Sequence, residues 1–189
     1  MQYIITSYQK HKETILFLVI SACIFIILNS LFKVYIAFTD IKGNYYSPLL
    51  AKYSLVQLIL DGLIYPAKGI LYIFGFETTS TSDQVSIVGY RAVHIAYPCM
   101  GVEMMIALMS LIMAYPRGKK KLISICSGIL IIHSLNIIRV TVLVFTGYLQ
   151  YSHSRTTHDL FNFFLYAVVF LYFIRWVKKQ NKESENSKV

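Results

Sequence analysis

The stretch Thr14–Phe32 reads TILFLVISACIFIILNSLF, which is 19 residues without a charged side chain. A helix of this length crosses the roughly 30 Å hydrocarbon core of a membrane. Lys10 and Lys12 precede the stretch, but residues 29–33 (NSLFK) lack the small-x-small pattern that follows a cleaved signal peptide. We therefore interpret it as an uncleaved anchor helix.

The composition of the whole chain supports a membrane protein. Hydrophobic residues make up 56% of the 189 residues and charged residues only 14%, whereas soluble domains carry about 25% charged residues. So few charges exclude a water-soluble globular protein, and so many apolar residues exclude intrinsic disorder. The predicted fold class is an all-α integral membrane protein, a bundle of four or five transmembrane helices with a short extracytoplasmic β-prone loop.

Three further apolar segments are predicted to cross the membrane, and a fourth is ambiguous. The three are residues 100–116, 122–148 and 160–174. Residues 53–76 form a weaker candidate because Asp61, Pro66 and Lys68 interrupt them. This segment is either a fifth span or a helix that lies at the membrane interface.

Basic residues predict the orientation of the chain. Residues 117–121 (RGKKK) carry four positive charges, and Lys178, Lys179, Lys182 and Lys188 follow the last apolar segment. Both regions should be cytoplasmic by the positive-inside rule, which places residues 76–98 and 149–158 outside. The net charge of +9 therefore indicates membrane topology, and we expect no nucleic-acid partner. The side of the N-terminus stays open, since it depends on whether residues 53–76 cross.

The chain divides into four predicted regions. Residues 1–76 hold the anchor helix and the weak second segment, and residues 77–98 form an extracytoplasmic loop. Within this loop, Glu77–Asp83 is polar and turn-rich, while the β-branched and aromatic residues around Gly89 predict two short strands. Residues 99–177 form a three-helix membrane core, and residues 178–189 a basic cytoplasmic tail.

Three chemically reactive side chains fall near the predicted outer face. Cys99 follows Pro98 at the start of the second long span, Arg139 lies in the outer half of the third, and His158 starts the fourth. A thiolate is favoured at a helix N-terminus or beside a cation. His158 can take the thiol proton and return it to a leaving amine. Arg139 can anchor a carboxylate or stabilise an oxyanion.

Arg139 also has a structural interpretation. It lies roughly 13 Å below Tyr148 at 1.5 Å per residue, where a charge facing lipid costs about 3 kcal/mol. It must therefore face the bundle interior or a wet cavity. Glu103, one helical turn after Cys99, offers an ion-pair partner that would simply join two helices.

Other polar residues receive ordinary interpretations. Cys23 and Cys126 sit in apolar runs as small hydrophobes, and no cysteine spacing predicts a disulfide framework or a zinc site. His94 and His133 are expected in packing roles, with His133 bonding across helices. Asp159 is expected to cap the fourth span, and Tyr97 is a weaker site candidate.

Three motifs resemble those of a known family. Cys99-Met100-Gly101, Asn136-Ile137-Ile138-Arg139 and His158-Asp159 are similar, in order and spacing, to the C-x-G, N-x-x-R and H-D signatures of the exosortase/archaeosortase family. The likeness covers roughly residues 55–177. It departs from the family at Met100, where Ser is frequent, and at Asn162, where Gly is frequent.

The resemblance implies a function and a place in the cell. It implies a membrane-embedded cysteine peptidase or transpeptidase in a bacterial or archaeal plasma membrane, with its active site on the extracytoplasmic side. The substrate would be an exported protein that ends in a short motif, a transmembrane helix and a basic tail, and the product would pass to an unknown acceptor. Cys99 would be the nucleophile, Arg139 the essential cation and His158 the proton-transfer group, supported by Asn136, Gly101, Glu103 and Asp159.

Two other functional classes remain open at this stage. A non-catalytic scaffold or transporter subunit would use a structural Glu103–Arg139 pair and tolerate replacement of Cys99. A metal-dependent hydrolase would use His94, Cys99 and His158, although no H-E-x-x-H or comparable ligand spacing is present. We expect no cofactor and no metal.

Overall fold

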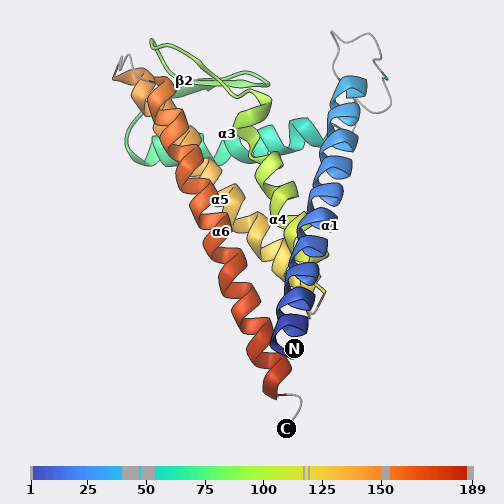
Figure 1. Ribbon diagram of the computed structural model, residues 1–189. Helices are drawn as coiled ribbons and strands as arrows, with labels where there is room; N and C mark the ends of the chain where they lie inside the picture. The colour runs from blue at the N-terminus through green and yellow to red at the C-terminus, as the bar shows by residue number, and fades with distance from the viewer. Residues whose placement is uncertain are drawn as a thin grey trace.

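The structure is a computed structural model, and the residues that it describes form nine elements. It describes the backbone of residues 2–39, 47, 54–116, 118, 120–149 and 154–186, and side chains at 12–39, 47, 54–97, 99–116, 118, 120–149 and 160–183. In chain order the elements are α1 (Gln2–Thr39), α3 (Leu55–Ile73), β1 (Thr78–Ser80), β2 (Gln84–Ile87), β3 (Val93–His94), the 3₁₀ helix η1 (Tyr97–Met100), α4 (Val102–Ala114), α5 (Lys121–Tyr148) and α6 (Ser154–Asn186) (Figure 1).

The helices confirm the predicted fold class. Four helices within the described residues are long and apolar enough to cross a membrane: residues 12–39 of α1, α3, α5 and residues 160–183 of α6. Their outward faces carry exposed Leu, Ile and Phe side chains, as a lipid-facing surface requires. The chain is therefore a multi-pass integral membrane protein, and the expected spans at 14–32, 122–148 and 160–174 each lie inside one of these helices.

The expected span at residues 100–116 is shorter than predicted. The helix α4 has 13 residues, about 20 Å at 1.5 Å per residue. It starts only after Gly101, whose φ of 72° interrupts the helical path. It ends at Tyr115, which is extended because the residue before a proline, here Pro116, disfavours helical backbone.

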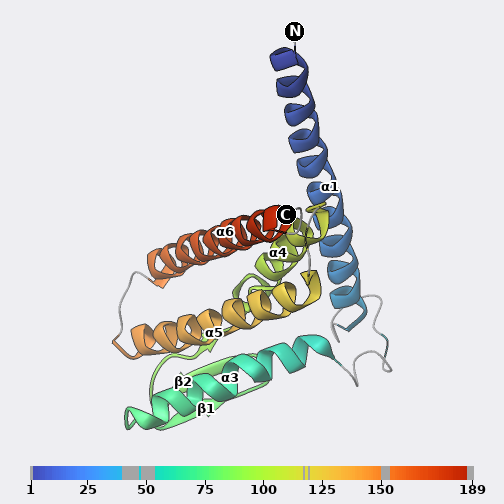
Figure 2. The same ribbon diagram turned by 90° about the horizontal axis from the view of Figure 1, so that it is seen from below.

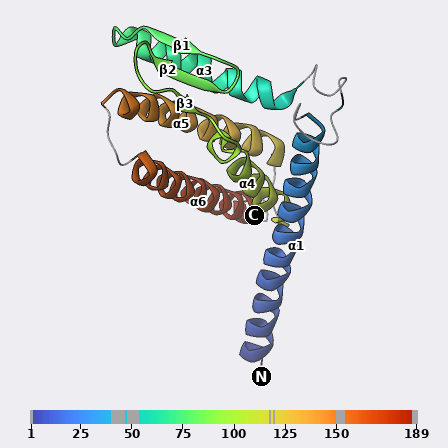
Figure 3. The same ribbon diagram turned by 90° about the horizontal axis from the view of Figure 1, so that it is seen from above.

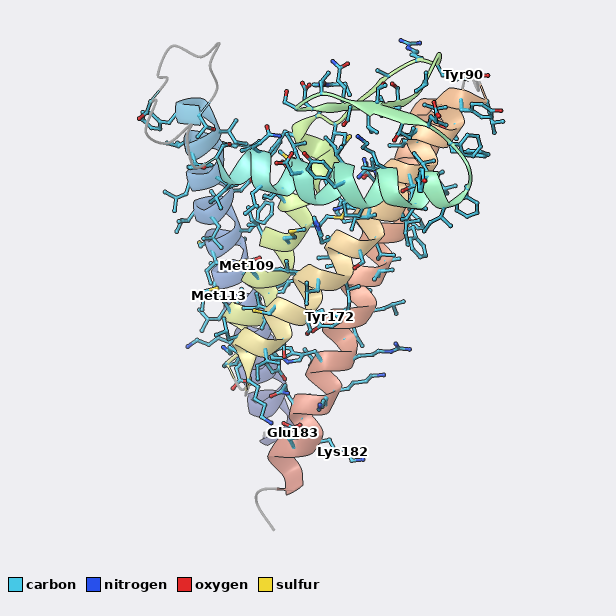
Figure 4. All side chains as sticks on the ribbon, turned by 180° about the vertical axis from the view of Figure 1, so that it is seen from behind. Tyr90, Met109, Met113, Tyr172, Lys182 and Glu183 are labelled. Atoms are coloured by element: carbon cyan, nitrogen blue, oxygen red, sulfur yellow. The ribbon has the colours of Figure 1, made fainter. Side chains whose placement is uncertain are left out.

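The helix α3 lies across the bundle. Ser54 caps its start by accepting a hydrogen bond from the backbone of Gln57. The helix is long enough to span, yet it runs transversely to α4 and α6 at one end of the bundle (Figures 1 and 4). This arrangement matches the interfacial alternative for residues 53–76. Its buried face, which includes Leu63 and Ala67, packs on the rest of the protein.

A small sheet covers the same end, which we call the sheet end. The three strands are antiparallel in the order β1-β2-β3, with Thr79 opposite Ser86 and Val85 opposite Val93. The two strands expected around Gly89 are β2 and β3, and Gly89 turns between them with φ 83°. The strand β1 was not predicted, since it lies in the polar segment 77–83. Lys68 of α3 donates a hydrogen bond to Ser80 of β1.

The elements form layers. Seen from above and below, β1, β2 and α3 lie on one side of α5, and α6 lies on the other (Figures 2 and 3). One apolar core joins the sheet, α3, η1 and the second half of α5, with Leu63, Val85, Met100 and Val144 among its buried residues. A second core joins α4, the first half of α5 and α6 around Leu108 and Leu165.

The helix ends are distributed between the two ends of the bundle as follows from the order of the elements. The end of α5, the start of α6 and the start of α4 lie at the sheet end, as does Tyr90 (Figures 1 and 4). The start of α1 lies at the opposite end together with Lys182 and Glu183 of α6. The chain therefore begins and finishes its helical part at the same end, as expected if α3 does not cross the bundle.

Candidate functional site

Cys99 lies on a short turn between the sheet and α4, which we call the Cys99 turn (residues 97–101). Ala96 is extended, and Pro98 occupies the start of η1, where its missing N–H costs nothing. The amide of Cys99 donates to the carbonyl of Ala96 at 2.8 Å, and Gly101 ends the turn in the left-handed region. Cys99 was predicted at the start of a long span. It instead precedes α4, separated from it by the kink at Gly101.

Arg139 reaches the Cys99 turn from α5. Its side chain is 0% exposed, and its Nη2 donates a hydrogen bond to Sγ of Cys99 at 3.7 Å. Val140 and Val144, which follow it on α5, are also buried. The predicted convergence of thiol and guanidinium from separate elements is thus present, and the cation faces the protein interior as its depth required.

Asn136 holds the Cys99 turn from one helical turn earlier on α5. Its side chain is fully buried, and Nδ2 donates to the carbonyl of Met100 at 3.2 Å. A Cβ atom on Gly101 would lie only 1.8 Å from this nitrogen. The glycine of C-x-G and the asparagine of N-x-x-R therefore meet in the same contact. Gly101 also has a φ of 72°, a backbone conformation that residues with a side chain rarely adopt.

Several polar atoms of this cluster have no hydrogen-bond partner among the described residues. They are Nε and Nη1 of Arg139 and Oδ1 of Asn136, all buried. Such atoms are costly unless a ligand or water satisfies them. The arrangement offers donors on a fixed cation and one acceptor, all close to a thiol. It can hold a group that carries negative charge, such as a carboxylate or an oxyanion.

Glu103 does not pair with Arg139. The ion pair between His94 and Asp83 at 3.1 Å is formed on the sheet, but none joins Glu103 to Arg139 in the described part of the chain. Glu103 is half-buried on α4, and its charge acts on Tyr97 instead. Burial, together with the Glu103 carboxylate, raises the pKa of Tyr97.

His158 and Asp159 fall in the first turns of α6, but their side chains lie outside the described residues. The helix that carries them starts at the sheet end, where the Cys99 turn also lies (Figure 1). The structure thus brings together Cys99, Gly101, Asn136 and Arg139, and the contribution of His158 and Asp159 stays a prediction.

The remaining reactive residues have other surroundings. His133 forms the expected bond across helices, with Nε2 at 3.1 Å from the carbonyl of Gly62 on α3. Cys23 on α1 and Cys126 on α5 are exposed on the outside of the bundle. Within the described residues, no group of three or more His, Cys, Asp or Glu side chains is arranged to hold a metal ion.

One contact near the site was not predicted from the sequence. The hydroxyl of Tyr97 donates to Oδ1 of Asn29 on α1 at 3.3 Å, and the Tyr97 ring stacks on Phe32 with centroids 5.8 Å apart. The available signal was that Asn29 is the one amide side chain in the uncharged run 14–32. Intramembrane amides usually bond across helices.

Comparison with known proteins identifies one family. A family model described as transmembrane exosortase matches residues 63–175. Neither the curated proteins nor the solved structures give a match to the chain. The matched segment runs from α3 into α6, contains the whole Cys99 turn together with Asn136 and Arg139, and leaves α1 outside.

Proposed function

The chain belongs to the transmembrane exosortase family, and we propose on that premise that it is a membrane-embedded cysteine transpeptidase. Its substrate is an exported protein with a C-terminal sorting signal made of a short motif, a transmembrane helix and a basic tail. The enzyme cleaves at the motif and transfers the exported part to an acceptor. Residues 99–177 carry the reaction, residues 1–76 anchor it, and the tail 178–189 is cytoplasmic.

The observation that carries this proposal is the contact between Arg139 and Cys99. The Arg139 guanidinium has no exposed surface, its Nη2 lies 3.7 Å from the sulfur, and its other two nitrogens have no hydrogen-bond partner among the described residues. Burying a cation in this way is costly, and Glu103 does not neutralise it through an ion pair. A structural role is therefore a poor explanation of Arg139, whereas negative charge that develops during catalysis would be stabilised at this position.

The proposed reaction has two steps. The Cys99 thiolate attacks the carbonyl carbon of the scissile peptide, a tetrahedral oxyanion forms, and the C–N bond breaks as the leaving amine takes a proton. This leaves a thioester between the exported protein and Cys99. A nucleophile on the acceptor, or water, then attacks the thioester carbonyl, the C–S bond breaks, and the Cys99 thiolate is released.

Each residue near the sulfur has a proposed part in these steps. Arg139 stabilises negative charge, first on the sulfur and then on the oxyanion. Asn136 and Gly101 fix the turn that presents the thiol. His158 accepts the thiol proton and delivers it to the leaving amine. Asp159, expected to cap the fourth span, instead lies inside α6, which begins five residues earlier at Ser154, so it does not cap that helix.

The proposed orientation places the sheet end outside the cell. The basic connection 117–121 and the end of α6 would then face the cytoplasm, as the positive-inside rule favours. The active site would open to the extracytoplasmic side of a bacterial or archaeal plasma membrane. Exported substrates would reach it there with their transmembrane helix still in the bilayer.

The test is processing of a substrate in membranes. A reporter that ends in a sorting motif, an apolar helix and a basic tail is expressed with the parent enzyme or with a Cys99→Ala variant. We expect Cys99→Ala to abolish cleavage, while Cys126→Ala, a matched control on the outer surface of α5, cleaves normally. Membrane insertion is checked for each variant by fractionation. Normal cleavage by an inserted Cys99→Ala protein would refute the proposal.

A further inference from the structure

The anchor helix α1 contacts the Cys99 turn through one polar side chain. Asn29 accepts a hydrogen bond from the Tyr97 hydroxyl at 3.3 Å, across 68 positions of sequence. Phe32, almost one helical turn further along α1, stacks on the Tyr97 ring. Both a directional bond and an aromatic contact therefore fix Tyr97 against α1.

The position of Asn29 makes an incidental contact a poor explanation. Asn29 lies within a 19-residue run that is otherwise well suited to lipid. An amide in hydrocarbon is unfavourable unless it finds a partner, and interhelical partners are the usual solution. Here the partner lies two residues before Cys99. Helix α1 itself lies outside the segment matched by the family model.

The Cys99 turn is consequently held from two sides. On the α5 side, Asn136 donates to the carbonyl of Met100 at 3.2 Å, directly after Cys99. On the α1 side, Asn29 and Phe32 hold Tyr97, directly before Pro98. A 3₁₀ turn of four residues has few hydrogen bonds of its own, so these outside contacts determine where the sulfur lies.

We propose that Asn29 and Tyr97 form a positioning pair, through which α1 holds the Cys99 sulfur within reach of Arg139. Neither residue is assigned contact with the reacting atoms. The inference extends the proposed function by giving the anchor helix a part in the active site. The inference rests on the proposed function only in one respect, namely that the Cys99–Arg139 contact serves catalysis.

The experiment measures the contact between Cys99 and Arg139 without any substrate. The full chain, with Cys23→Ala and Cys126→Ala as background, is alkylated in membranes with iodoacetate or with iodoacetamide. These reagents are similar in size, but only iodoacetate is negatively charged. The measured quantity is the rate with iodoacetate divided by the rate with iodoacetamide. This ratio rises with positive charge beside the sulfur, whereas a change in the overall accessibility of the sulfur affects both rates and largely cancels. Arg139→Gln sets the scale, and we expect it to lower the ratio about tenfold.

The positioning pair is then removed one side at a time. Tyr97→Phe keeps the ring that stacks on Phe32 and loses the hydroxyl, while Asn29→Leu removes the acceptor. Each should lower the ratio about threefold, the size expected for one hydrogen bond. The double variant should fall no further than the lower single variant, since both changes remove the same interaction.

The control is Tyr172→Phe, which removes the tyrosine hydroxyl that bonds Ser124 and Ser127 between α6 and α5. Its ratio should equal that of the parent. A parent-like ratio in Tyr97→Phe and Asn29→Leu, or additive losses in the double variant, would overturn the positioning pair and leave the proposed function standing. A parent-like ratio in Arg139→Gln would overturn both. Loss of substrate cleavage by Cys99→Ala is scored separately and bears only on the proposed function.

Discussion

Two polar regions of α5, one near its start and one past its middle, differ in how completely their polar atoms are hydrogen-bonded. Near the start of α5, the Tyr172 hydroxyl of α6 lies 2.7 Å from the carbonyl of Ser124 and 2.6 Å from the hydroxyl of Ser127 (Figure 4). Toward the end of α5, Asn136 and Arg139 reach the Cys99 turn but leave three buried polar atoms without partners among the described residues.

The difference distinguishes a packing contact whose polar groups bond one another from a cluster whose polar groups do not. The Tyr172 contact is neutral, and its members satisfy one another, which is what a stable interhelical contact requires. The Arg139 cluster holds a full charge, and two of its hydrogen-bond donors have no partner among the described residues. A fold under selection for stability alone would lose such a group, because apolar residues of similar volume are often as stable or more stable. The Arg139 donors that lack partners among the described residues support the proposed role in binding negative charge.

Among substitutions in these two regions, replacement of Arg139 should have the largest effect on substrate cleavage. Arg139→Gln keeps a long polar side chain but removes the charge. We expect substrate cleavage to fall by two to three orders of magnitude, which is typical when an oxyanion-stabilising group is lost. The measurement is the initial rate of reporter cleavage in membranes with equal enzyme content. Retention of more than a tenth of the parent rate would place Arg139 outside the chemistry.

Substitution of Gly101 should have the next largest effect. An added Cβ at Gly101 would meet Nδ2 of Asn136 at 1.8 Å and would also strain the left-handed backbone, a conformation that costs about 1–2 kcal/mol. Gly101→Ala should therefore displace Asn136 from the Met100 carbonyl and lower cleavage at least about tenfold. That figure corresponds to about 1.4 kcal/mol.

Gly69→Ala provides the matched control for this substitution. Gly69 lies on α3, and nothing within 4 Å would meet its added Cβ. Its cleavage rate should match that of the parent, and a helical Ala in place of Gly should if anything stabilise α3. Equal activity of the Gly101 and Gly69 variants would show that the Asn136 contact does not determine the Cys99 turn.

Substitution of Glu103 should have a small effect. Because no ion pair joins Glu103 to Arg139 in the described residues, Glu103→Gln removes no direct partner of Arg139. Cleavage should change by no more than about threefold, within the range of a weak electrostatic contribution. A loss as large as that of Arg139→Gln would instead show that Glu103 and Arg139 act as a pair.

Substitution of Tyr172 should have the smallest effect on activity. Tyr172→Phe removes two interhelical hydrogen bonds and should lower the free energy of unfolding in detergent by about 1 kcal/mol. Cleavage in membranes should be unchanged, because the contact lies in the part of α5 distant from Arg139. If Tyr172→Phe lowered the cleavage rate as much as Arg139→Gln does, the contrast between the two regions of α5 would be wrong.

Features that depend on composition and spacing were predictable from the sequence. Uncharged runs identified the long helices, because a membrane tolerates few charges. Arg139 was assigned to the interior because its depth makes lipid exposure costly. The likeness to the family rested on Cys99, Asn136, Arg139 and His158 in order, and the family match bears it out.

Features that depend on a single contact were beyond such reasoning. The break before α4 lies at the left-handed Gly101, where Asn136, 35 positions later, leaves no room for a side chain. The transverse path of α3 follows from packing against the sheet and α5, whereas hydropathy records only that the segment is apolar. The bond from Asn29 to Tyr97 needed the relative position of two helices. The strand β1 gains its stability from pairing with β2, which its polar sequence conceals.

The central claim is that Cys99 forms a covalent intermediate with its substrate. It is tested most directly by acid-quenching membranes during turnover of the reporter and analysing the enzyme by mass spectrometry. We expect a thioester that joins the exported part of the reporter to Cys99, is cleaved by hydroxylamine and is absent from the Cys99→Ala variant. Cleavage of the reporter by the parent enzyme with no such adduct, or with an adduct on another residue, would contradict it.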